Sequence, residues 1–217
     1  MSTPQPLLPP LADQAERLIE LGVHDLAELS AEQVRAFVAE YGPQRQDALL
    51  AVHPSRAPAS VLAPLMRRDG KPGFVVEDMT DVDAFTPVEI ELPHTALYLV
   101  VDPLRGEDMA NWSPEEAMPA LTSRERAPLL LSEGIHWVLQ QPGILERNLC
   151  FMTIGSRLEK ATGKYDSRTP ALWISGGTGR DGCERKNAAK VGWCWWRNRH
   201  TWLGIASVAG RTPEAMA

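Results

Sequence analysis

Residues 171–196 read ALWISGGTGRDGCERKNAAKVGWCWW, two apolar stretches joined by a loop of glycines and charged residues. A third apolar stretch, 149–154, lies upstream, and a polar turn region, 162–170, separates it from the stretch that begins at Ala171. No helical pattern interrupts the series, so we predict three strands: Leu149–Ile154, Ala171–Ser175 and Val191–Trp196. Strands this close in sequence favour antiparallel pairing, because parallel neighbours need a long crossover.

Two further strands and two helices are predicted before this region. Val88–Leu92 alternates apolar and polar residues as a half-buried strand does, and Ala96–Val101 is a continuous apolar run, as in a central strand. Ser113, with Glu116 three positions later, forms the capping box of one helix. Ser132 is predicted to cap a second helix that extends through Gln141.

The N-terminal segment has helical periodicity. One helix is predicted from Leu11 to the stop at Gly22, a second after the capping box at Ser30, and a third, short one over 43–52. The fold class is therefore α+β: a mostly antiparallel or mixed sheet with packed helices and a small N-terminal helical subdomain. The predicted parts are a disordered tail (1–10), the helical subdomain (11–57), the main α+β domain (58–211) and a second tail (212–217).

Composition excludes several classes of protein. The 217 residues are 44% hydrophobic and 23% charged, as in an ordinary globular protein, and no apolar run approaches the ~20 residues of a membrane span. The N-terminus lacks the pattern of a secretory signal, and three widely spaced cysteines fit a reduced chain, so we expect a cytoplasmic protein without a membrane partner. A net charge of −6 disfavours nucleic acid as a partner. The oligomeric state and any cofactor stay unknown.

Aromatic and basic residues gather in one window, Gly176–Arg211. It contains four of the seven tryptophans. Between Arg180 and His200 there are six basic residues and only two acidic ones. Aromatic side chains next to cations are typical of ligand sites. We therefore predict a pocket for a small molecule, an anion among the candidates, with His200 as a polar anchor. Its other predicted ligand-binding residues are Trp173, Trp193, Trp195, Trp202, Arg157 and Arg197.

An alternative interpretation is an enzyme of group-transfer type. If 191–196 is a strand, Cys194 and Trp196 share one face, and His200 beyond the next turn could hold Cys194 as a catalytic thiolate. The same residues, with Cys183, include zinc-ligand types, but their spacing is poor for a metal site, so no metal is predicted. The sequence thus leaves open whether the protein is an enzyme. A third interpretation is a non-enzymatic interaction module with an exposed Trp/Arg face.

Several short motifs in this order resemble those of a known family. They are Asn111-Trp112-Ser113-Pro114-Glu115, Pro170-Ala171-Leu172-Trp173-Ile174-Ser175, Gly192-Trp193-Cys194-Trp195 and His200-Thr201-Trp202-Leu203-Gly204. The set is similar to an actinobacterial family labelled only as a domain of unknown function. The resemblance covers about residues 10–211. It implies a bacterial cytosolic protein and no particular substrate.

Overall fold

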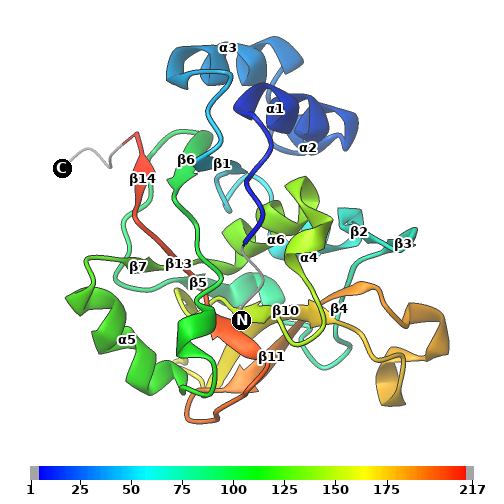
Figure 1. The fold of residues 1–217 in the computed structure, drawn as a ribbon, viewed down its shortest axis with the longest axis vertical. Coiled ribbons are helices and arrows are strands. Elements are labelled where there is room, and N and C mark those ends of the chain that lie inside the picture. The colour runs from blue at the N-terminus through cyan, green and yellow to red at the C-terminus, as the bar shows by residue number, and fades with distance from the viewer. Residues whose placement is uncertain (1–4, 214–217) are drawn as a thin grey trace.

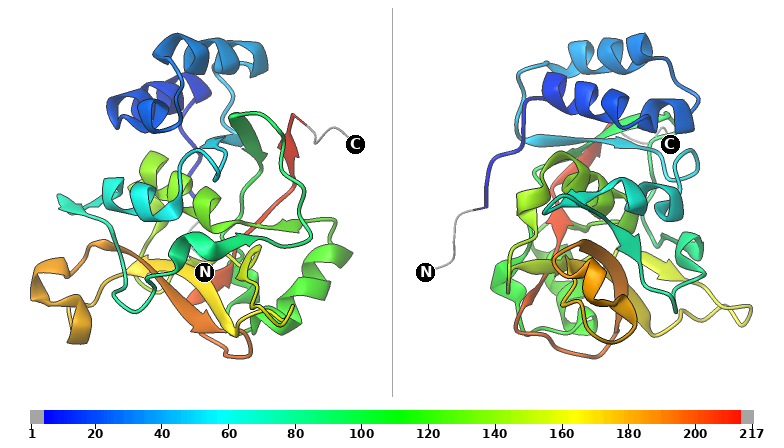
Figure 2. Two further views of the ribbon diagram at one scale, coloured as in Figure 1. Left: turned by 180° about the vertical axis from the view of Figure 1, so that it is seen from behind. Right: turned by 90° about the vertical axis from the view of Figure 1, so that its right-hand side faces the viewer.

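The structure, a computed structural model, describes residues 5–213 and has the predicted α+β architecture. Figure 1 shows a helical layer at the top, a small sheet beneath it, a central helix, α6, and the largest sheet at the bottom. The two views in Figure 2 show the same order of layers from behind and from the side. The central helix is therefore enclosed between two sheets.

The helical layer is formed as the sequence predicts. Its members are α1 (Leu11–Glu20), α2 (Val23–Leu26) and α3 (Ala31–Tyr41). Gly22 takes a left-handed conformation (φ 69°) after α1, and the Ser30 hydroxyl accepts a hydrogen bond from the Gln33 amide at the start of α3. Buried apolar residues on α1 and α3 hold the two helices against each other and against the small sheet.

The predicted helix over 43–52 is wrong, because this segment contains a strand, β1 (Ala48–Val52). All five of its residues are buried, so the apolar run serves a strand covered on both faces, which periodicity alone does not distinguish from a helix. The three-stranded sheet has the order β1, β6 (Leu97–Val101) and β14 (Gly210–Thr212), with antiparallel pairs.

The outer edge of β1 has no neighbouring strand, and side chains complete its hydrogen bonds. The Gln14 side chain of α1 accepts from the Leu50 amide (2.8 Å) and donates to the Ala48 carbonyl (2.9 Å). The His136 Nε2 of α6 accepts from the Val52 amide (3.2 Å). Buried backbone groups must be paired, so these two side chains satisfy the edge and join the helical layer to the core.

Helix α6 (Leu131–Gln140) is buried along its whole length. It begins two residues earlier than predicted, with Leu130 rather than Ser132 at the N-cap position. Instead the Glu133 carboxylate accepts from the Leu130 amide (2.9 Å), and the Ser156 hydroxyl accepts from the Leu131 amide (3.0 Å). A distant loop therefore supplies part of the cap, which local sequence cannot reveal.

Glu133 also carries the central ion pair of the core. The Arg211 guanidinium of β14 donates to both carboxylate oxygens (2.6 and 2.7 Å), and the Tyr98 hydroxyl of β6 donates to one of them (3.1 Å). The Glu133 side chain is fully buried and that of Arg211 nearly so. One carboxylate thus fixes α6, β6 and β14 together.

The large sheet contains the three strands that the sequence predicts. Its order is β12 (Leu203–Ile205), β8 (Cys150–Met152), β10 (Arg168–Ile174), β11 (Ala189–Trp195) and β4 (Phe74–Val75). The β8–β10–β11 pairs are antiparallel and the outer two are parallel. Trp173 lies across Gly192, where an added Cβ would come within 2.3 Å of its ring.

Smaller elements surround these layers. They are α4 (Ala59–Leu62), α5 (Pro114–Ser123), and the pairs β2 (Arg67–Arg68) with β3 (Lys71–Pro72), β5 (Phe85–Pro87) with β9 (Ser156–Leu158), and β7 (Ala127–Pro128) with β13 (Ser207–Val208). Helix α5 has the predicted capping box between Ser113 and Glu116.

Residues 5–10 lie against the body rather than forming a free tail. The Gln5 side chain donates to the Pro103 carbonyl (2.7 Å) and accepts from the Arg105 amide (2.9 Å), and Leu8 is buried. Residues 1–4 and 214–217 of the predicted tails lie outside the described residues. The boundary between residues 57 and 58 stays a prediction, although β1, before it, pairs with β6, after it. No helix within 5–213 has the length and apolarity to cross a membrane.

Removal of Arg211 tests the central ion pair. We expect Arg211→Met to lower the free energy of unfolding by about 3–5 kcal/mol, because the Glu133 charge would stay buried without its partner. The double variant Glu133→Gln/Arg211→Met should recover part of that loss. Urea denaturation measures both.

Arg35→Met is the matched control for this experiment. It removes a bidentate pair of the same geometry with Glu16 (2.6 and 2.8 Å) that is exposed, and its unfolding midpoint should hardly move. Equal losses from the two arginine variants would contradict the role assigned to Arg211.

His136 makes stability depend on pH. Burial lowers its pKa from 6.5 to about 4, so between these values the unfolded chain binds a proton that the folded protein excludes. Stability should fall as pH drops from 6.5 toward 4, by up to about 3 kcal/mol from this residue. Urea titrations of wild type and His136→Gln measure the effect, and equal slopes in the two proteins would refute it.

Candidate functional site

An apolar cavity lies between the end of β1, α4, the start of α6 and the segment 82–94. Its volume is about 440 Å³. We call it the His53 cavity, and its apolar wall consists of Val82, Phe85, Ile90, Leu92, Leu130 and Leu131 together with Ala59 and Pro54, Pro58 and Pro87. Its polar lining residues are His53, Ser55, Asp83, Thr86, His94, Ser132 and Ser156. The segment 82–94 lies toward the viewer in the left panel of Figure 2.

His53 reaches the cavity because β1 ends at the preceding residue. Its amide still donates to the Ala96 carbonyl (2.9 Å), after which the chain turns. The Ser55 amide (3.2 Å) and hydroxyl (2.7 Å) both contact the His53 Nδ1. A backbone amide can only donate, so Nδ1 accepts, and the neutral ring carries its hydrogen on Nε2. Burial, then the nearby His94 and Arg56, lower the pKa of His53 and favour that neutral ring.

The predicted strand Val88–Leu92 is wrong, because the segment 88–92 is not part of a strand. It lies between β5, which pairs with β9, and β6, and Glu89 breaks the extended chain with a positive φ of 53°. The alternation is nevertheless real: Ile90 and Leu92 are half-buried and line the cavity, whereas Glu89 and Glu91 are exposed. The alternation therefore predicted correctly which side chains are buried. Their apolar side lines a cavity and does not pack in a sheet.

The acidic lining residue already has partners. The two Asp83 oxygens accept from the Ser60 amide (2.8 Å) and the Ser60 hydroxyl (2.5 Å) at the start of α4. Ser156, at the floor, accepts from the Leu131 amide. The imidazoles are different, because neither His53 nor His94 has an ion-pair partner within residues 5–213.

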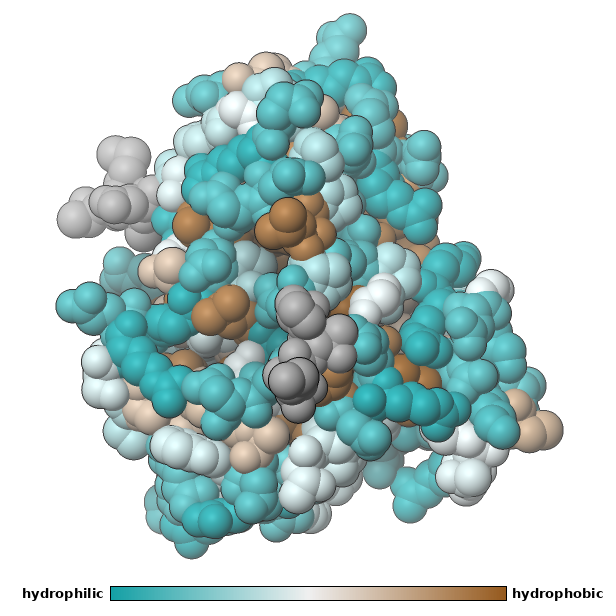
Figure 3. Space-filling model, in the orientation of Figure 1, coloured by the Kyte–Doolittle hydropathy of each residue, from teal (hydrophilic) through white to brown (hydrophobic). Residues whose placement is uncertain are grey.

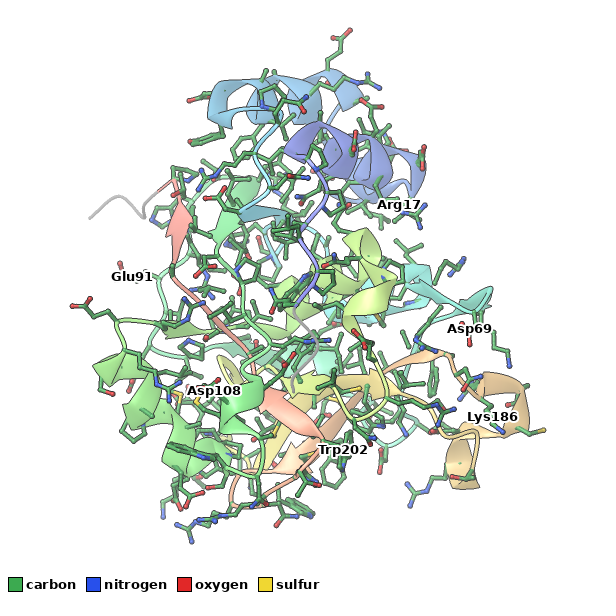
Figure 4. All side chains as sticks on the ribbon, viewed as in Figure 1. Arg17, Asp69, Glu91, Asp108, Lys186 and Trp202 are labelled. Carbon is green, nitrogen blue, oxygen red and sulfur yellow. The ribbon has the colours of Figure 1, made fainter. Side chains whose placement is uncertain are left out.

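The residues predicted from the sequence lie elsewhere, in separate groups, and none of them lines the His53 cavity. Trp173 contacts Trp202 edge-on, with 6.0 Å between ring centroids. Trp202 also contacts His200, with 5.6 Å between ring centroids. Trp193 contacts Trp195 (4.6 Å), as expected for residues on one strand face. In Figure 4, Trp202 lies at the lower centre, well apart from Glu91 of the cavity segment.

The two predicted arginines also differ from each other in setting. Arg157 is buried, stacks on Trp196 (3.8 Å to the centroid) and donates to the Asp166 carbonyl (2.7 Å). Arg197 is 80% exposed and pairs with Glu115 (3.1 Å). Arg157 thus lies beside Trp196, and Arg197 lies at the surface.

The environment of Cys194 works against a thiolate. It is opposite Thr169 in the β10–β11 pair and nearly buried. Burial raises the pKa of its thiol to about 12, and Lys190 only weakly opposes this. Burial also lowers the pKa of His200. Residues 5–213 contain no hydrogen bond between the His200 ring and Cys194, and the buried His200 Nε2 has no partner there.

The glycine-rich loop holds a carboxylate of its own. The Lys190 ammonium donates to both Asp181 oxygens (2.8 Å each), and the Ser175 hydroxyl donates to one of them (2.8 Å). Lys190 of β11 therefore neutralises the loop's Asp181. No group of three or more His, Cys, Asp or Glu side chains in the described chain is placed to hold a metal ion.

A family comparison places the chain. A model described as "Family of unknown function (DUF5701)" matches residues 17–214. The chain belongs to this family. No curated protein and no solved structure matches it. Membership in DUF5701 thus agrees with the resemblance seen in the sequence and assigns no activity to the cavity.

The cavity residues of this DUF5701 chain carried little signal in the sequence. His53 follows the apolar run 48–52 directly, and a polar residue at the end of a buried strand is a common position for a site. His94 lies 41 positions further on, beside the second run of the same sheet. Only the pairing of β1 with β6 brings them to one end of the sheet.

Thiol labelling tests the interpretation of Cys194. Iodoacetamide at pH 7 should modify the exposed Cys183 first and leave Cys150 and Cys194 almost unmodified, because burial raises both of their pKa values. Peptide mass spectrometry locates the label. Cys183→Ser is the control and should take up almost no reagent. Labelling of Cys194 faster than a free thiol would restore the enzyme interpretation.

Proposed function

We propose that the protein binds a small, largely apolar molecule in the His53 cavity. The single observation that supports this is an open apolar cavity of about 440 Å³, a volume within the range of small-molecule sites. Apolar lining with a few polar groups is the usual composition of such sites.

The hydrophobic effect favours a ligand in this cavity. An open cavity exposes its apolar lining to water, and covering that surface is favourable. Ile90 and Leu92 sit half-buried on a segment without sheet partners, where a small shift of the chain could close the space. A ligand would bury the apolar surface that the protein leaves open there.

The pocket predicted from tryptophan, arginine and histidine residues stays a prediction. So does the alternative of an enzyme with Cys194 and His200 as catalytic residues. Trp195 and Trp112 are exposed, so the third interpretation, an interaction module with an exposed Trp/Arg face, also stays a prediction. The face in Figure 3, however, is mostly hydrophilic, with hydrophobic residues in small separate spots. The face in this view therefore carries no broad apolar docking surface among the described residues.

A neutral apolar dye provides the test. N-phenyl-1-naphthylamine should bind the folded protein with one saturable site and a blue-shifted emission. Ile90→Trp should lower the affinity about tenfold or more, because the larger ring would occupy the cavity. Fluorescence titration measures the affinity.

Val61→Trp is the matched control. It adds the same ring to an exposed position of α4 that does not line the cavity, so dye binding should not change. Dye binding that is absent, or that both tryptophan variants reduce equally, would overturn the proposed function.

A further inference from the structure

We infer that the ligand of the His53 cavity carries a carboxylate, which His53 and His94 hold at its entrance while the apolar body fills the interior. The ligand class is an apolar carboxylic acid with an acyl or aryl body. This inference rests on the proposed function and adds the chemistry of the head group.

The two imidazoles come from separate segments that meet at the cavity. His53 follows β1, and His94 precedes β6, its antiparallel partner. Both line the cavity, and they lie close enough for the charge of His94 to oppose a charge on His53. Two cationisable rings on one opening, each without an ion pair in the described chain, form a site for one anion between them.

The hydrogen-bonding state of His53 suits an acceptor on the ligand. In the neutral ring Nδ1 accepts from the Ser55 amide, so Nε2 carries the hydrogen and donates. In the charged ring both nitrogens donate: Nδ1 gives up the bond from the Ser55 amide and donates to the Ser55 hydroxyl, and Nε2 stays a donor. A carboxylate only accepts hydrogen bonds, and its bond to an imidazolium is charge-assisted. A ligand ammonium would find no acceptor on this ring.

Apart from the exposed Glu89 and Glu91 of the segment 82–94, which solvent screens, the charges near His53 are bonded or positive. Both oxygens of Asp83 are occupied by Ser60, and Arg56 lies on the same turn as His53 with a long contact to Glu28 (3.4 Å). Beneath the cavity Glu133 is neutralised by Arg211 and bonded by Tyr98. His136 on α6, with a pKa of about 4, stays neutral near pH 7.

Proton uptake should accompany binding. In the empty cavity the pKa of His53 is lowered by burial, His94 and Arg56, and a carboxylate beside the ring would favour its charged form. An acid with an ordinary carboxyl pKa is fully ionised at pH 6 and at pH 8. Affinity for the acid should therefore rise between pH 8 and pH 6, whereas affinity for a neutral analogue should not change.

Displacement of bound N-phenyl-1-naphthylamine compares head groups on one chain length. Octanoate should displace the dye at about tenfold lower concentration than 1-octanol at pH 6, and this preference should shrink at pH 8. Because 1-octanol is the more hydrophobic of the two, hydrophobicity alone gives the opposite order. 4-Phenylbutanoate in the same assay distinguishes an aryl from an acyl body.

His94→Gln tests the second imidazole without disturbing the core, since His94 is exposed. This variant should still bind the dye and lose the preference for octanoate, while His24→Gln, a histidine of α2 outside the cavity lining, should keep it.

The outcomes separate the two proposals. No dye binding defeats the proposed function. Dye binding with 1-octanol equal to or better than octanoate at pH 6 leaves that function standing and overturns the carboxylate, as does a preference for octylamine. An octanoate preference that His94→Gln does not affect overturns the two-histidine site.

Discussion

The buried carboxylate of Glu133 is the group on which the rest of the structure depends. It closes the first turn of α6, accepts the Tyr98 hydroxyl of β6 and pairs with Arg211 of β14. A lone charge at that depth would be very unfavourable, so these donors must all be present together. Helix α6 in turn carries His136, which satisfies the edge of β1. The position of both ends of the small sheet, and so of the His53 cavity, follows from one helix.

Local signals in the sequence predicted much of the fold. The capping boxes at Ser30 and Ser113, and the apolar runs that became β8, β10 and β11, are decided by residues near each other in the chain. Their hydrogen bonds and packing need few distant partners, so the pattern was sufficient. The α+β class follows from these elements alone.

The errors occur where distant residues supply the missing bonds. Segment 48–52 is a strand because β6 pairs with one edge and Gln14 and His136 complete the other, and none of these is adjacent in sequence. The start of α6 depends on Ser156 in the same way. For the candidate site, composition indicated the tryptophan-rich window, and that site stays a prediction. Of its residues, Trp173 packs over Gly192 and Arg157 over Trp196. The cavity is instead assembled from ordinary residues that only the tertiary fold brings together.

The position of β14 in the small sheet determines when the nascent chain can fold its core. Arg211 is made after Glu133 and Tyr98, its partners. Until residue 211 has left the ribosome, the Glu133 carboxylate has no guanidinium and β6 has only β1 beside it. The nascent chain therefore cannot complete this core one part at a time, because its central ion pair and the third strand of the small sheet form only after residue 211 has been made.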